Sequence, residues 1–144
     1  MEKGLVCLVL HAHLPYVRHP EGEEYLEERW LYEGITETYV PLLQMLEKLV
    51  ADDIDFRITI SLSPPLISML RDELVMKKYR QHLEGLMELA ALEVERTRNM
   101  PEFNYTAQLY QQRYQKIHRT IFDENGGDLL NAFRKLLTTG RVEL

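Results

Sequence analysis

Apolar and polar residues follow two different periods along this chain, and the changes between them divide it into strands and helices. Residues 5–10 form an unbroken apolar run, too short for a helix and rich in β-forming residues. We therefore predict a strand buried on both faces that ends at His11. Apolar and polar residues alternate over residues 56–62, which predicts a second strand with one apolar and one polar face. Residues 140–144 predict the beginning of a third strand.

Helical spacing of apolar residues fills most of the remaining chain. It runs from Arg29 to Val50, where Pro41 lacks a backbone donor and predicts a kink or a new helix start capped by Thr38. Further helices are predicted over residues 66–70, 73–98, 105–122 and 129–137. Residues 12–28 contain prolines, a glycine and several acids, so we expect a long polar loop after the first strand.

The order of these elements is strand, helix, strand, several helices, strand. This order is typical of an α/β fold with a parallel sheet, and neither an internal repeat nor a low-complexity tract interrupts it. Three strands are too few to close a barrel, so we expect the fold to be unfinished in this chain.

Composition and charge indicate which kinds of binding partner to expect. The 144 residues carry 23 acidic and 17 basic side chains, a formal net charge of -6, and no basic cluster longer than Lys77 and Lys78. A nucleic-acid partner is therefore not expected. The single cysteine, Cys7, has no partner within the chain for a disulfide, which fits a reducing compartment. The apolar run near the start is too short to cross a membrane, so we expect a cytoplasmic protein with no membrane partner.

His11 and His13 are the first candidates for a functional role. They are two residues apart at the carboxyl end of the predicted first strand, so both imidazoles should point to one face. Ligand sites of parallel α/β folds lie at the carboxyl ends of their strands. The pair is therefore predicted to bind or act on a ligand. The alternative is that one imidazole hydrogen-bonds a loop carbonyl and shapes the turn at Pro15.

A histidine pair of this spacing can also hold zinc, which prefers imidazole nitrogen. A catalytic zinc site needs a third protein ligand, and the other histidines are His19, His82 and His118. The last two fall on predicted helices away from the strand ends, so no metal is assigned.

Trp30, the only tryptophan, stands at the start of the predicted first helix, where its indole could lie against the apolar face of a sugar ring. Core packing against Leu31 and Tyr32 is the alternative. Ser61 and Ser63 lie on the polar face of the second strand, which would line a barrel interior near His11. For Ser63 we expect no more than hydrogen bonds to neighbouring backbone groups.

Paired carboxylates are the usual catalysts of glycoside chemistry, and acids are plentiful on the predicted first helix. Their helical spacing predicts a solvated face. Glu33 could help to position the loop beside Trp30, although a salt bridge to Arg29, one turn back, would also explain it. The acids of this helix region are Glu27, Glu28, Glu33 and Glu37.

The string Leu-His-Ala-His-Leu-Pro-Tyr-Val-Arg at residues 10–18 resembles the first motif of glycoside hydrolase family 57, in the version found in its 1,4-α-glucan branching enzymes. Residues 28–43 resemble the helix that follows this motif in the family, residues 59–66 its second strand and turn, and residues 140–144 the start of its third strand. Ala12 and Gly34 are small departures from the family pattern.

This resemblance implies that residues 1–144 are the N-terminal portion of an incomplete (β/α)7 barrel, with parallel strands and a helix-rich insertion, ending within the third strand. It implies transfer of α-glucan segments by a retaining double displacement, as in glycogen biosynthesis, on glycogen, amylose or a starch-like polymer. The nucleophile Glu and the acid/base Asp are expected beyond residue 144, so the fragment is predicted to be inactive alone. The resemblance assigns substrate binding to His11, with His13 and Trp30 beside it, and no metal or cofactor.

Other functions stay open at this point. The same family includes α-amylases, 4-α-glucanotransferases and pullulanases, and their choice of acceptor depends on loops outside this chain. A metal-dependent hydrolase could use the His-x-His pair. A non-enzymatic helical interaction module is a further alternative, and it would fold as a cooperative monomer. An unfinished barrel should instead expose unpaired strand edges and associate, and it needs the remainder of the barrel for a complete fold.

Overall fold

The computed structural model describes Gly4, residues 6–20 and residues 25–144. Three strands, β1 (Val9–Ala12), β2 (Ile58–Leu62) and β3 (Val142–Glu143), form one sheet in the order β1-β2-β3. Both pairings are parallel, which confirms the predicted α/β fold. The helical elements in chain order are α1 (Leu26–Glu33), the π-helix η1 (Gly34–Tyr39), α2 (Val40–Ala51), α3 (Pro64–Arg71), α4 (Glu73–Arg96), α5 (Pro101–His118), the π-helix η2 (Arg119–Asp123) and α6 (Leu129–Leu137).

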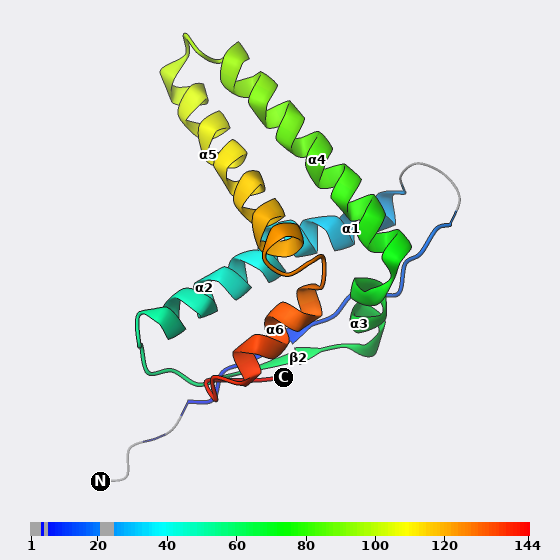
Figure 1. The fold of residues 1–144 in the computed structure, drawn as a ribbon, viewed down its shortest axis with the longest axis vertical. Helices are drawn as coiled ribbons and strands as arrows, with labels where there is room; N and C mark the ends of the chain where they lie inside the picture. The colour runs from blue at the N-terminus through cyan, green and yellow to red at the C-terminus, as the bar shows by residue number, and fades with distance from the viewer. Residues whose placement is uncertain (1–3, 5, 21–24) are drawn as a thin grey trace.

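The helices are arranged in two parts around this small sheet (Figure 1). α1, η1 and α2 run as one long rod across the middle of the molecule, and α6 contacts α2, α3 and β3. α4 and α5 form an antiparallel hairpin that projects away from the sheet. This hairpin is the helix-rich insertion that the sequence predicts between the second and third strands.

Aspartates begin two of these helices. Asp72 accepts hydrogen bonds from the amides of Leu74 and Val75 at 2.9 and 3.0 Å and so caps α4. Asp128 accepts from the amide of Asn131 at 2.9 Å and caps α6. Both side chains satisfy amides that would otherwise have no partner within the helix.

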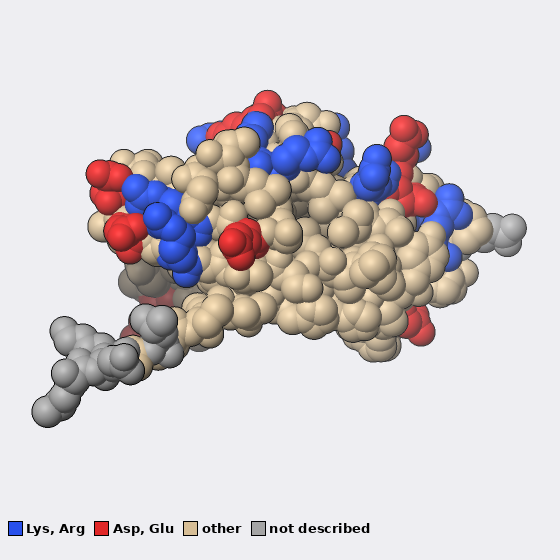
Figure 2. All heavy atoms as spheres, turned by 90° about the horizontal axis from the view of Figure 1, so that it is seen from below, with Lys and Arg blue, Asp and Glu red and all other residues tan. Residues whose placement is uncertain are grey.

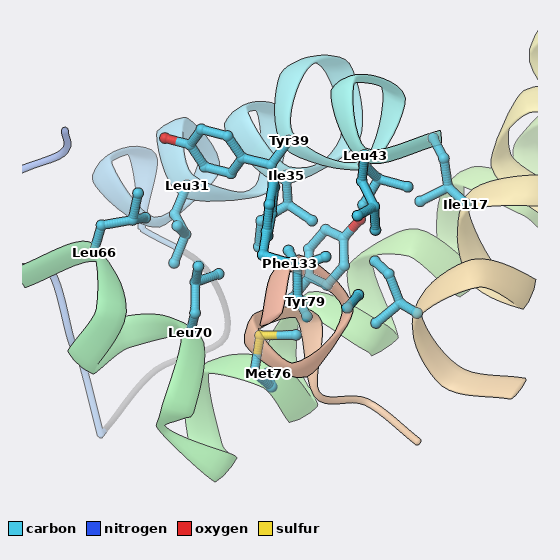
Figure 3. Packing of buried hydrophobic residues seen from close by; sticks show 14 of the residues in the cluster. Leu31, Ile35, Tyr39, Leu43, Leu66, Leu70, Met76, Tyr79, Ile117 and Phe133 are labelled. Carbon is cyan, nitrogen blue, oxygen red and sulfur yellow. The ribbon is translucent and has the colours of Figure 1, made fainter. Parts of the chain in front are cut away.

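One apolar core joins the rod, the base of the hairpin, α6 and one face of the sheet (Figure 3). Ile35, Tyr79 and Leu43 are fully buried at its centre, and Phe133 enters from α6. The Tyr79 hydroxyl lies 3.1 Å from the Thr36 hydroxyl, so this buried phenol has a hydrogen-bond partner. Burial raises the pKa of Tyr79 well above its ordinary value. The phenol therefore stays neutral.

The two faces of the sheet have different environments. Ile60 and Val142 are buried against the helices. Val9 is 56% exposed on the opposite face, which no described element covers. Viewed from the sheet end of the molecule, much of the surface carries neither basic nor acidic side chains (Figure 2). The prediction that the first apolar run is a strand buried on both faces is wrong for this chain. The strand begins later, at Val9, and lies at the edge of the sheet.

The predicted helix restart near Pro41 also differs from the structure. The backbone stays helical through the proline, and the Val40 amide donates to the Ile35 carbonyl, five residues back. Because Pro41 has no amide to donate, the chain accommodates it with a π-helical turn instead of a capped break. Tyr39 occupies the N-cap position of α2 and makes no side-chain cap bond, so the role predicted for Thr38 is wrong.

None of the helices in the described part of the chain is both long and apolar enough to cross a membrane.

Candidate substrate-binding site

His11 and His13 lie side by side at the carboxyl end of β1. Their ring centroids are 5.9 Å apart and their planes are within 9° of parallel, which confirms that the two imidazoles share one face. Both side chains are exposed. His11 is in register with Ser61 of β2, so the Ser61 hydroxyl lies on the same uncovered face. The arrangement offers imidazole and hydroxyl groups to a ligand at the strand ends.

The loop that leaves the histidine pair is tied to α3 and to the start of α4. The amide of Val17 donates to the sulfur of Met69 at 3.2 Å, and Nε of Arg18 lies 2.7 Å from Oδ2 of Asp72. Desolvation acts to raise the pKa of Asp72, but its hydrogen bonds from Arg18 and from two helix amides outweigh this and lower it. Asp72 therefore begins α4 and holds the loop at the same time.

A buried ion pair holds the same loop further along. Glu28 is 4% exposed, and its carboxylate oxygens lie 3.1 and 3.2 Å from Nζ of Lys78. Lys78 also donates to the carbonyl of His19 at 2.8 Å, and the amide of His19 donates to Glu28 at 3.3 Å. The prediction that Glu28 lies on a solvated helix face is therefore wrong, since its charge is neutralised inside the fold.

Trp30 is 48% exposed at the surface of α1, so core packing is not its role. It lines a shallow hollow with Leu14 and Pro15, the two residues that follow His13. Met69 also lines this hollow. The structure thus places the indole beside the loop that leaves the histidine pair, with much of its surface open to solvent.

Ser63 differs from its prediction. Its hydroxyl is buried and has no hydrogen-bond partner among the described residues, although neighbouring backbone groups were expected to satisfy it. The Ser63 amide donates to the carbonyl of Ala12 at 3.0 Å and so continues the pairing of β1 with β2 beyond the strand ends.

The other three histidines do not lie beside His11 and His13. His82 lies on α4 against the ring of Tyr32, and His118 lies on α5 against Phe122, as the helical pattern predicts. His19 stacks on Tyr25 at a centroid distance of 3.9 Å. Within the described ranges, no group of three or more His, Cys, Asp or Glu side chains is placed to hold a metal ion.

Arg18, Asp72 and Lys78 hold the loop, but the sequence did not indicate that they would do so. The ion pairs that they make join residues 54 and 50 positions apart, beyond the reach of any local pattern. A single aspartate before a helix predicts a cap, yet it does not reveal which arginine it will also bind.

Comparison with known proteins identifies the family of this chain. Over residues 7–144 the chain matches the family described as glycosyl hydrolase family 57. A 1,4-α-glucan branching enzyme of Thermococcus kodakarensis is 32% identical over 142 residues, covering 99% of this chain and 20% of that enzyme.

Solved structures agree with this match. The α-amylase AmyC of Thermotoga maritima is 46% identical with a TM-score of 0.87, over 95% of this chain and 26% of that protein. A branching enzyme of the same family from Pyrococcus horikoshii is 29% identical with a TM-score of 0.84, over 94% and 25%. The fold is therefore that of the N-terminal part of a (β/α)7 barrel, and the chain spans about a quarter or less of these relatives. The chain belongs to glycosyl hydrolase family 57.

Proposed function

We propose that this chain is the N-terminal part of the catalytic barrel of a 1,4-α-glucan branching enzyme and that it supplies part of the substrate cleft. The observation that carries the proposal is the parallel pair of exposed imidazoles at the carboxyl end of β1. Family membership and the branching enzymes among its relatives support it. A cytoplasmic location and a role in glycogen biosynthesis belong to the same proposal.

In this proposal His11, His13 and Trp30 bind the glucan. The imidazoles hydrogen-bond sugar hydroxyls beside the reacting carbon, and these bonds strengthen as positive charge develops on the sugar ring. The half-exposed indole of Trp30 offers a flat apolar surface to a neighbouring sugar. A nucleophilic glutamate and an acid/base aspartate from the rest of the barrel carry out the double displacement. Later strands extend the sheet at its free edge, and the uncovered face lines the barrel interior.

α-Amylase activity is the second candidate, because the amylase AmyC shares 46% identity with this chain. The same binding residues serve both reactions. A glycosyl-enzyme that is resolved by water gives hydrolysis, whereas one resolved by a sugar hydroxyl gives a branch.

The activity of the chain itself tests where the carboxylates lie. The purified 144-residue protein is incubated with amylose. Reducing ends are then counted, and branch points are counted from the side chains that a debranching enzyme releases. We expect neither to increase. Turnover by this chain alone would overturn the proposal that the catalytic carboxylates lie outside it.

Binding tests the assigned residues. Titration with maltoheptaose, followed by ¹H–¹⁵N NMR of the imidazoles, should shift the signals of His11 and His13. We expect His11→Ala to weaken binding at this site about tenfold, the loss of one or two good hydrogen bonds. Gln112→Ala, at an exposed position on α5, is the matched control. Unchanged imidazole signals at saturating sugar would remove both histidines from the site.

A further inference from the structure

A second candidate site lies among the helices, and none of its walls belongs to the sheet or to the loop after β1. A cavity of about 420 Å³ opens between the α1–η1 rod and the α4–α5 hairpin. Charged, imidazole and phenol groups meet in its wall. They include Arg29, Glu33, Glu37, His82, Tyr110 and Tyr114.

Two aromatic side chains extend this cavity into a longer groove. Tyr110 and Tyr114 lie one turn apart on α5 with ring centroids 5.7 Å apart, and Tyr110 is 39% exposed. Together with Leu86 they also line a neighbouring cavity of about 520 Å³, where the exposed ring of Phe103 adds an apolar wall. Each volume is within the range of small-molecule sites, which are about 300–1,000 Å³. The two rings therefore line both spaces.

The charges around the first cavity balance each other. Glu37 is held by Arg113, with Nη2 and Oε2 2.5 Å apart, while Arg29 and Glu33 bring one charge of each sign. A phosphate or a metal cation would find as many unfavourable charges as favourable ones. A neutral ligand with many hydroxyls would find both donors and acceptors, with aromatic faces beside them.

The phenol of Tyr114 adds a stable donor to this wall. Burial, then the nearby carboxylate of Glu37 and the Tyr110 phenol, raise the pKa of Tyr114 above its ordinary value, and Arg113 opposes this in part. The hydroxyl therefore keeps its proton through the neutral range and can donate to a ligand oxygen.

We propose that this groove binds a second segment of α-glucan, with sugar rings stacked on Tyr110 and Tyr114 and hydroxyls bonded to the charged wall. The inference rests on the proposed function, which makes α-glucan the polymer that this chain meets. Two attachment points on one polymer raise its effective concentration at the strand-end site. The groove would thus keep a long glucan close to the cleft between turnovers.

The test uses NMR titration of the 144-residue chain with maltoheptaose, following backbone amides of α4 and α5. We expect Tyr110→Ala to weaken the transition seen in these helices about tenfold, and Tyr110→Phe to restore most of the affinity. Tyr105→Ala is the matched control, because Tyr105 is 71% exposed on the same helix and is not part of the cavity walls. Far-UV circular dichroism confirms that each variant keeps its helices.

His11→Ala separates this proposal from the previous one. If this variant loses the sugar-induced signal shift of His13 but keeps the shifts of the α4 and α5 amides, the chain has two independent sites. If the hairpin shifts without the imidazoles, the groove binds glucan and the histidine assignment fails. Cellohexaose that binds the groove as tightly as maltoheptaose would overturn the choice of α-glucan. Absent hairpin shifts, or shifts caused only by protein concentration as in self-association through Phe103, would overturn the groove proposal itself.

Discussion

Glu28 and Lys78 show, at the scale of single residues, how a surface pattern can hide a buried charge. Glu28 belongs to an acid-rich stretch that resembles any solvated helix face, yet it is 4% exposed and holds the loop after β1. The period of two that places His11 and His13 on one face is local and could be predicted from the sequence. The partner of Glu28 could not, because Lys78 is 50 positions away and is brought there by packing of α4.

Lys78→Met should destabilise the fold strongly. The change keeps the length of the side chain but leaves the Glu28 carboxylate buried without its cation, which costs on the order of 3–5 kcal/mol. Urea denaturation followed by circular dichroism measures the loss. Lys77→Met, at the exposed neighbouring position, should change the midpoint little. Equal midpoints for the two variants would mean that the ion pair is not a stabilising contact.

Asp72 should make stability depend on acid pH. Because its pKa in the folded protein is lowered, the ionised carboxylate stabilises the fold at pH values above its ordinary pKa of 3.8, and this stabilisation disappears as the pH falls toward the lower value. Asp72→Asn keeps a helix cap but removes the negative charge that pairs with Arg18, so the stability of this variant should fall less steeply on acidification. Urea midpoints across the acid range measure this. Asp123→Asn, at an exposed position, should follow the parent chain.

The secondary-structure elements were largely predictable, because each depends on a period that the sequence carries by itself. β2 ends before the two prolines as expected, and α6 has the predicted bounds. The errors occur where an element depends on what packs against it. β1 is shorter and more exposed than its apolar run predicts, because the burial of a strand depends on what packs against each of its faces. The π-helix η1 arises because the rod stays packed on both sides of Pro41, so a break that is locally favoured does not form.

Asp128→Ala tests the local origin of α6. The aspartate caps the helix that carries Phe133 into the core, and loss of such a cap costs about 1 kcal/mol. Asp128→Asn should recover most of this, since an amide oxygen can accept the same bond. Thermal unfolding of the three proteins gives the comparison. An alanine variant as stable as the asparagine one would show that packing alone defines the start of α6.

The whole molecule presents a sheet that is finished on one side only. The helices bury Ile60 and Val142, while Val9 is 56% exposed on the face that they leave open. Polar groups of His11, Thr59 and Ser61 share this open face with Val9, so the two free edges of the parallel sheet, more than its face, are prone to pair with other chains. This chain spans about a quarter or less of its relatives, and in a closed barrel strands pair edge to edge while one face of the sheet points to the interior.

We therefore expect the isolated chain to self-associate through the free edges of its sheet. Val9→Lys should shift it toward the monomer with little loss of stability, because a charge on the exposed face needs no burial and deters edge pairing. Ile60→Lys, one strand away on the covered face, should prevent folding, since a lysine there would be buried without a partner. Sedimentation velocity over a range of concentrations, with circular dichroism, distinguishes the two. If the Val9→Lys variant associates as strongly as the parent chain, the contact between copies lies elsewhere. The Phe103→Lys variant would then show whether the α4–α5 hairpin mediates the association.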